Sequence, residues 1–211
     1  MNAVAGSRLK RAAEILSVVF HPIFIPLYGL IIIYSANTLH SFLPLQLKRM
    51  IFILVMANNV LLPMALATVL YARGAINTFN ARDRNERVLL LTFSLVMYSL
   101  TAFLLFRMQV PGLFRAFFIA IAVVTLITLL ITVLYRISLH ASGIGGLLVL
   151  VLFMAGLYHI SMVWQAVAVL LAGSAVLSSR IYLGDHSPSE VWSGFFAGAV
   201  IMGLSLFLIL K

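Results

Sequence analysis

The chain has 211 residues, of which 64% are hydrophobic and only 9% charged, with a mean hydropathy of +1.16 and a formal net charge of +9. This composition excludes a soluble globular domain and indicates an integral membrane protein. The absence of cysteine excludes disulfides and thiolate metal sites, and the scattering of 14 basic residues between apolar runs favours lipid headgroups over nucleic acid as their partner.

Seven apolar segments have, or nearly have, the length of about 20 residues that a membrane-spanning helix needs. We therefore predict an all-α fold, a polytopic membrane helix bundle with six or seven transmembrane helices in a single domain over residues 1–211. The first segment is the weakest of the seven, because His21-Pro22 and Pro26 interrupt its hydrogen-bond ladder. Basic residues precede it as in a signal peptide, but no small-residue cleavage pattern follows, so we expect this segment to be retained. The predicted spans are Ala13–Ser35, Met50–Ala72, Val88–Met108, Ala116–Tyr135, Gly143–Ile160, Met162–Leu177 and Val191–Leu210.

Polar residues gather in three of the connections between these spans. The first is Arg73–Arg87, the second is Tyr135–Gly146, and the third is Ser178–Gly198, which runs into the start of the last span. Two predicted crossings separate each of these stretches from the next, and an even number of crossings returns the chain to the same side. We therefore expect all three stretches at one membrane face, where a single site built from them is possible.

The side chains in these stretches suit the handling of a phosphate group. Guanidinium groups bind phosphate oxygens in pairs of hydrogen bonds, and a serine hydroxyl with a glycine N–H at a helix start can add to the cradle. Histidines can act as nucleophile and as general acid. No dense carboxylate cluster is present to hold magnesium, so we expect neither a metal nor a cofactor. The combined inventory is Arg82, Asp83, Arg84, Glu86, Arg87, His140, Ser142, Gly143, Arg180, Asp185, His186 and Glu190.

The third stretch, SRIYLGDHSPSE, resembles the third signature of the type 2 phosphatidic acid phosphatase (PAP2) superfamily. That signature is Ser-Arg, five residues, His, three residues and Asp. Here Ser179-Arg180 is followed at the same spacings by His186 and by Glu190 in place of the aspartate. The order of the polar stretches also matches the family, so the resemblance covers about residues 80–211.

The other two signatures of the family depart from its pattern. The first is Lys, six residues and Arg-Pro, where Arg87 matches the arginine, Asn80 stands at the lysine position, and Arg82 or Arg84 would supply the second cation. Val88 replaces the proline. The second signature is Pro-Ser-Gly-His, of which Ser142-Gly143 matches the middle, while Ala141 and Ile144 replace the outer residues.

The resemblance implies a lipid phosphatase that cleaves a phosphomonoester or a prenyl pyrophosphate through a phosphohistidine. His186 would attack phosphorus, Glu190 would orient its imidazole, and His140 would protonate the leaving oxygen. The phosphate-binding residues would be Arg84, Arg87, Ser142, Gly143 and Arg180. The expected partners are the lipid substrate and the surrounding lipids, and the expected location is the bacterial inner (plasma) membrane, with several passes.

Simpler interpretations of the same residues stay open. Ser187-Pro188-Ser189-Glu190 is also a helix capping box, in which Glu190 would return to the Ser187 N–H instead of orienting His186. Arginines near helix ends commonly extend to headgroups, which we favour for Arg136. Gly194 and Gly198 indicate helix packing, and Asn58 with Asn59 indicates interhelical hydrogen bonding.

Two other functions compete with the phosphatase. The altered signatures suit a catalytically inactive PAP2-like protein that binds or transports lipid phosphates. The intramembrane charges suit an unrelated transporter or channel that uses them as an ion path.

Overall fold

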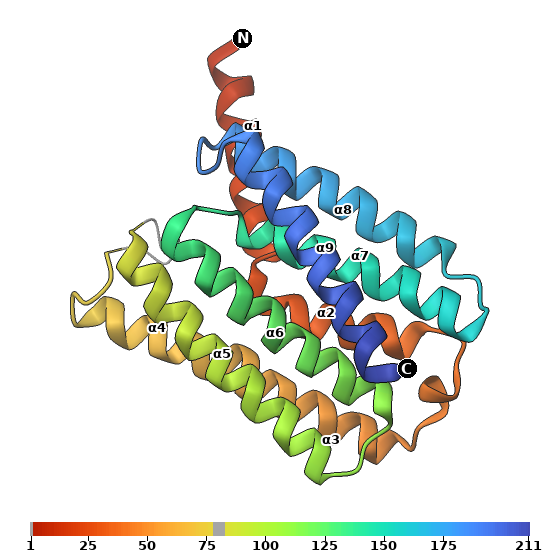
Figure 1. Ribbon diagram of the computed structural model, residues 1–211. Coiled ribbons are helices and arrows are strands. Elements are labelled where there is room, and N and C mark those ends of the chain that lie inside the picture. Colours follow the sequence, from red (N-terminus) through yellow and green to blue (C-terminus); the bar gives the residue numbers. More distant parts are fainter. Residues whose placement is uncertain (1, 78–82) are drawn as a thin grey trace. The chain divides into compact units, whose positions relative to one another are not determined.

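The structure is a computed structural model that describes residues 2–77 and 83–211. Within these residues the chain is entirely helical, without a strand, which confirms the predicted fold class (Figure 1). Seven helical segments are long and apolar enough to cross a membrane, which is the higher of the two numbers predicted. The chain is therefore a multi-pass membrane protein of the helix-bundle type.

The helices begin and end close to the predicted spans but extend further into the polar stretches. Short 3-10 turns, η1 and η2, interrupt the first part of the chain, and a π-helical turn, η3, joins α3 to α4. The bounds are α1 Asn2–Val19, η1 Pro22–Phe24, α2 Ile25–Ser35, η2 Leu39–Phe42, α3 Leu45–Val55, η3 Met56–Leu61, α4 Leu62–Ala72, α5 Arg84–Arg107, α6 Gly112–Leu134, α7 Leu139–Tyr158, α8 Val163–Tyr182 and α9 Pro188–Leu210.

The predicted break in the first span is confirmed at His21-Pro22. Helix α1 ends at Val19, and the His21 Nδ1 atom accepts a hydrogen bond from the Ile23 N–H at 3.3 Å, which caps η1. Proline at the first position of η1 has no N–H to satisfy. The chain then continues as α2, so α1 and α2 are two helices within one apolar stretch.

Caps explain why the helices start earlier than predicted. Asp83 precedes α5, and its carboxylate accepts the N–H groups of Asn85 at 2.9 Å and Glu86 at 3.4 Å. Ser138 precedes α7, and its hydroxyl accepts the Ala141 N–H at 3.4 Å. Satisfying these N–H groups stabilises the first turn of each helix. As a result, Arg84, Arg87 and His140 stand in the first turns of helices instead of in loops.

The chain divides into two compact units, each of which is described by itself. The first contains Met1–Ile25 and Ile137–Gly203, and α8 packs there against α1 and α7. Helices α7 and α9 also approach closely in this unit. A Cβ atom at Gly194 would lie 2.6 Å from the Ser138 carbonyl oxygen, and one at Gly198 would collide with the Ser142 carbonyl. The predicted packing role of Gly194 and Gly198 is thus confirmed.

The second unit contains Pro26–Arg136 and Leu204–Lys211. Helices α5 and α6 run side by side there, and the fully buried rings of Phe114, Phe117 and Phe118 on α6 form much of the core. The predicted interhelical hydrogen bonds are also confirmed. Thr101 of α5 accepts from the Asn58 Nδ2 atom at 3.2 Å and donates to the Asn59 Oδ1 atom at 2.8 Å, which joins α5 to the π turn.

Candidate functional site: a histidine, glutamate and arginine cluster

The turn between α8 and α9 brings the charged residues of the third polar stretch together. Helix α8 ends in a Schellman turn, where the Gly184 N–H donates to the Ile181 carbonyl at 3.0 Å and the Asp185 N–H donates to the Arg180 carbonyl at 3.2 Å. Gly184 has a φ of +68°, which glycine adopts without a steric penalty. The His186 N–H also donates to the Arg180 carbonyl, at 3.3 Å. The backbone therefore holds Asp185 and His186 against the end of α8.

Arg180 forms a buried ion pair with Asp185 in this turn. The Arg180 Nη1 atom lies 3.0 Å from the Asp185 Oδ2 atom, and the two side chains are 7% and 5% exposed. A buried charge is tolerated when it is paired with an opposite charge. Asp185 thereby fixes the head of Arg180 at the end of α8.

His186 is held by Glu190, as the resemblance implied. The His186 Nδ1 atom lies 2.9 Å from the Glu190 Oε2 atom, and the imidazole is 6% exposed. Because a carboxylate can only accept, Nδ1 carries the hydrogen, and in the neutral ring the Nε2 atom keeps its lone pair. This is the tautomer that a nucleophilic imidazole needs.

The capping box is present as well. The same Glu190 Oε2 atom accepts the Ser187 N–H at 3.1 Å, while the Ser187 hydroxyl accepts the Glu190 N–H at 3.3 Å. Capping α9 and orienting His186 are therefore not alternatives for Glu190. A single oxygen in fact serves both, because the two N–H groups approach it from neighbouring residues.

His140 lies in the same unit, near this turn. The Ser138 N–H donates to the Glu190 carbonyl at 3.0 Å, which joins the start of α7 to the first turn of α9. His140 is buried, with its Nε2 atom 3.0 Å from the Ser17 carbonyl oxygen, and it interacts electrostatically with Arg180 and His186. A carbonyl only accepts, so Nε2 carries the hydrogen and Nδ1 is the nitrogen that can exchange a proton.

Ser142 and Gly143 stand in the second turn of α7, further into the helix than expected. The Ser142 N–H donates to the Ser138 carbonyl at 3.0 Å, which leaves the hydroxyl as its polar group for a ligand. That hydroxyl is buried and has no hydrogen-bond partner among the described residues. A Cβ atom at Gly143 would lie 2.6 Å from the Ile25 side chain, so this glycine allows an apolar contact. Phosphate binding by Ser142 and Gly143 stays a prediction.

The predicted residues of the first signature belong to the second unit. Arg84 is exposed and Arg87 is 4% exposed, both in the first turn of α5, where they line a pocket. The carboxylate of Glu86 accepts from the Asn77 N–H at 2.6 Å and from its side-chain amide at 2.9 Å. Asn80 and Arg82 lie outside the described residues. The role of Arg84 and Arg87 in phosphate binding therefore also stays a prediction.

The sequence assigned no catalytic or phosphate-binding role to two residues of the cluster. Asp185 adjoins His186 and belongs to the polar inventory, but the family signature gives it no part. The Gly184-Asp185 pair after a helical pattern is the signal that could have placed it, since glycine there predicts a Schellman turn. His21 enters the sequence analysis only as part of the His21-Pro22 break, yet its ring lies 5.5 Å from the His140 ring, edge to face. No sequence signal predicts that long-range contact.

Within the described residues, no group of three histidine or carboxylate side chains is placed to hold a metal ion. Comparison of the chain with protein-family models, with characterised proteins and with solved structures found no match.

Proposed function

We propose that this chain is a metal-independent lipid phosphatase of the PAP2 type, acting on a lipid phosphomonoester or a prenyl pyrophosphate. The observation that carries the proposal is the 2.9 Å contact between the His186 Nδ1 atom and the Glu190 carboxylate, made in the same turn as the Arg180–Asp185 ion pair. An imidazole held in one tautomer next to a cation suits attack on an anionic phosphorus centre.

The first step is the transfer of the phosphoryl group to His186. Its Nε2 lone pair forms a bond to phosphorus while the bond from phosphorus to the lipid oxygen breaks. The imidazole becomes positively charged, and the Glu190 carboxylate stabilises that charge through the Nδ1–H. Arg180 binds equatorial oxygens of the transferring group, over which negative charge is spread.

The leaving oxygen needs a proton as it departs. His140 is the nearby imidazole of the cluster, and its Nδ1 atom is the one through which it would donate. Water then attacks phosphorus, the bond to the His186 Nε2 atom breaks, and inorganic phosphate leaves. The proton released by water returns to His140, which restores the starting state for the next substrate.

The membrane setting fits a lipid substrate. The His186 turn lies between two helices long enough to span a bilayer, so the scissile bond would sit near the headgroup plane and the tail along apolar helices. We place the chain in the bacterial inner (plasma) membrane on the strength of the family resemblance alone.

The test is phosphate release by the purified protein in EDTA, from phosphatidic acid and from prenyl pyrophosphate, with and without vanadate. We expect release that vanadate inhibits and that falls by at least about 10³-fold in His186→Asn, as when a nucleophile is removed. His159→Asn is the matched control, because His159 is exposed in the turn after α7 and asparagine tolerates its φ of 51°.

Labelled substrate should also leave an acid-labile phosphoprotein that is absent in His186→Asn. A protein that binds these lipids but releases no phosphate would be the inactive lipid-phosphate binder. Ion or lipid flux in liposomes without phosphate release would identify a transporter.

A further inference from the structure

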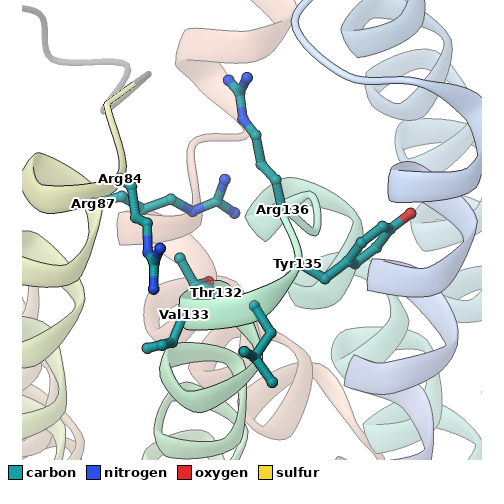
Figure 2. Close-up of a pocket in the computed structure, with 7 residues that line it drawn as sticks. Arg84, Arg87, Thr132, Val133, Tyr135 and Arg136 are labelled. Carbon is teal, nitrogen blue, oxygen red and sulfur yellow. The ribbon is translucent and has the colours of Figure 1, made fainter.

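The site residues are divided between the two units of the chain. Arg84 and Arg87 line a pocket in the second unit (Figure 2). His140, Arg180 and His186 belong to the first unit, together with the N-terminal part of the chain that ends at Ile25. The family resemblance covers about residues 80–211 and assigns nothing to that N-terminal part. Its role in the site has to be inferred from its own contacts.

The helix break at Pro22 provides a main-chain acceptor for His140. In a continuous helix the Ser17 carbonyl would accept the N–H four residues later, which is that of His21. The His21 N–H donates instead to the Val18 carbonyl at 3.2 Å, just after α1 ends. The Ser17 carbonyl accepts from the His140 Nε2 atom, at 3.0 Å. The break thus links the end of α1 to the first turn of α7.

The same break places the His21 ring against the His140 ring. The His21 Nδ1 atom accepts the Ile23 N–H at 3.3 Å, which fixes the direction of the His21 ring at the start of η1. The two ring centroids lie 5.5 Å apart and the planes are 85° to each other, an edge-to-face arrangement that is favourable for aromatic rings. His21 also interacts electrostatically with Arg180. The His21 ring therefore belongs to the surroundings of both His140 and Arg180.

His140 is held at two points by the N-terminal part of the chain. The torsion that turns an imidazole about its Cβ–Cγ bond is broad, so one hydrogen bond alone leaves the ring some freedom. The Ser17 carbonyl holds the Nε2 atom, and the His21 ring packs against the imidazole. The other titratable or charged groups that act on His140 are Arg180 at the end of α8 and His186 in the turn that follows. This arrangement leaves the Nδ1 atom as the one that can transfer a proton.

We infer that His21 is a positioning residue for His140, the general acid of the proposed reaction. The His21 ring keeps the imidazole aligned, so that the Nδ1 proton of cationic His140 passes to the lipid oxygen as the phosphorus–oxygen bond breaks. His140 becomes neutral in this step, and the lipid leaves as an alcohol. Proton transfer requires a well-aligned hydrogen bond, so an imidazole that can turn is a poorer acid catalyst. The inference rests on the proposed function, because it deepens the role that His140 has there.

The experiment compares two substrates that differ in their need for an acid. The alkoxide that leaves phosphatidic acid is strongly basic and requires a proton, whereas the phenolate that leaves p-nitrophenyl phosphate departs without one. The value of kcat/KM is measured for both substrates with the full-length protein in detergent. A misaligned general acid lowers only the first value, but a distorted site lowers both.

His21→Asn is the test variant, because asparagine is a good N-cap that can still accept the Ile23 N–H, while the ring is removed. His159→Asn is the matched control, since it makes the same change at an exposed histidine. His140→Asn and the double variant complete a double-mutant cycle, which measures whether the two histidines act together.

We expect His140→Asn to lower kcat/KM for phosphatidic acid at least about 10²-fold, as for the loss of a general acid. His21→Asn should lower it about tenfold, as for the loss of one favourable ring contact. Both variants should hydrolyse p-nitrophenyl phosphate within about twofold of the wild-type rate, and His21→Asn should have no further effect once His140 is replaced.

Unchanged hydrolysis of phosphatidic acid in His21→Asn would overturn the inference and leave the phosphatase standing. An equal loss for both substrates would also overturn it, and so would an undiminished loss in the His140→Asn background, since His21 would then only support the fold. Wild-type protein that releases phosphate from neither substrate would contradict the proposed function, and the inference with it.

Discussion

Replacing Glu190 by glutamine separates the two roles that its carboxylate combines. Glutamine is a capping-box residue like glutamate, so its side-chain oxygen can still accept the Ser187 N–H that now lies 3.1 Å from Oε2. It cannot supply the negative charge that stabilises a positively charged His186. We therefore expect a variant that folds normally and has lost most of its activity.

The magnitudes follow from the contacts. Glu190 is 21% exposed and the capping hydrogen bond is retained, so the free energy of unfolding should fall by only about 1 kcal/mol, the difference between a charge-assisted and a neutral hydrogen bond. The charge-assisted bond to His186 at 2.9 Å is replaced by a neutral one. In another enzyme where an amide replaces a carboxylate behind a catalytic histidine, kcat falls about 10⁴-fold, so we expect a loss of roughly 10²–10⁴-fold here.

The assay compares kcat and the midpoint of thermal unfolding for Glu190→Gln and Ser187→Ala in the same detergent. Ser187→Ala removes the hydroxyl that accepts the Glu190 N–H at 3.3 Å, so it should cost about 1 kcal/mol of stability and leave kcat within about threefold. Full activity in Glu190→Gln would refute the orienting role, because the carboxylate would then be only a helix cap.

Three further predictions follow from other contacts. Asp185→Asn should lower kcat/KM at least about tenfold, because the Arg180 head loses its ionic anchor, and wild-type kinetics would contradict this role. Gly198→Ala should destabilise the protein by about 1–3 kcal/mol in thermal unfolding, because its Cβ would collide with the α7 main chain, whereas Gly156→Ala, whose Cβ meets open space, should not. Burial lowers the pKa of His40 below its usual 6.5, so protonation favours the unfolded state and stability should fall as the pH drops below about 6.5. His40→Gln should flatten that part of a stability profile measured between pH 5 and 8, and an unchanged slope would exclude His40 as its source.

The sequence predicted the helical fold well because apolar length alone identifies a membrane span. The prediction was less accurate at the helix ends, because the first turns of α5 and α7 contain polar residues that hydropathy does not assign to a span. Ser138 and Asp83 are good N-caps, and recognising them would have moved the starts of α7 and α5 to Leu139 and Arg84. This difference matters for function. Ser142 lies in the second turn of α7, so its N–H donates to the Ser138 carbonyl within the helix and is not available to bind a phosphate.

The local part of the candidate site was also predictable. His186 and Glu190 are four residues apart at the start of a helix, and that spacing alone brings them within hydrogen-bonding reach. The contacts of His140 with Ser17 and His21 join segments more than a hundred residues apart in the chain. Such contacts depend on how α1 packs against the other helices of its unit. The hydrophobic pattern of the sequence does not specify that packing.

The Schellman turn after α8 has a consequence for how the protein would respond to its bilayer. Its hydrogen bonds, the Arg180–Asp185 pair and the His186–Glu190 contact all lie between residues 180 and 190. A thinner or thicker membrane tilts spanning helices at a modest cost in energy. We expect such tilting to alter how readily a lipid reaches the imidazole, and to leave the direction of its reactive nitrogen unchanged. Reconstitution in lipids of different chain length would then change the apparent KM much more than kcat.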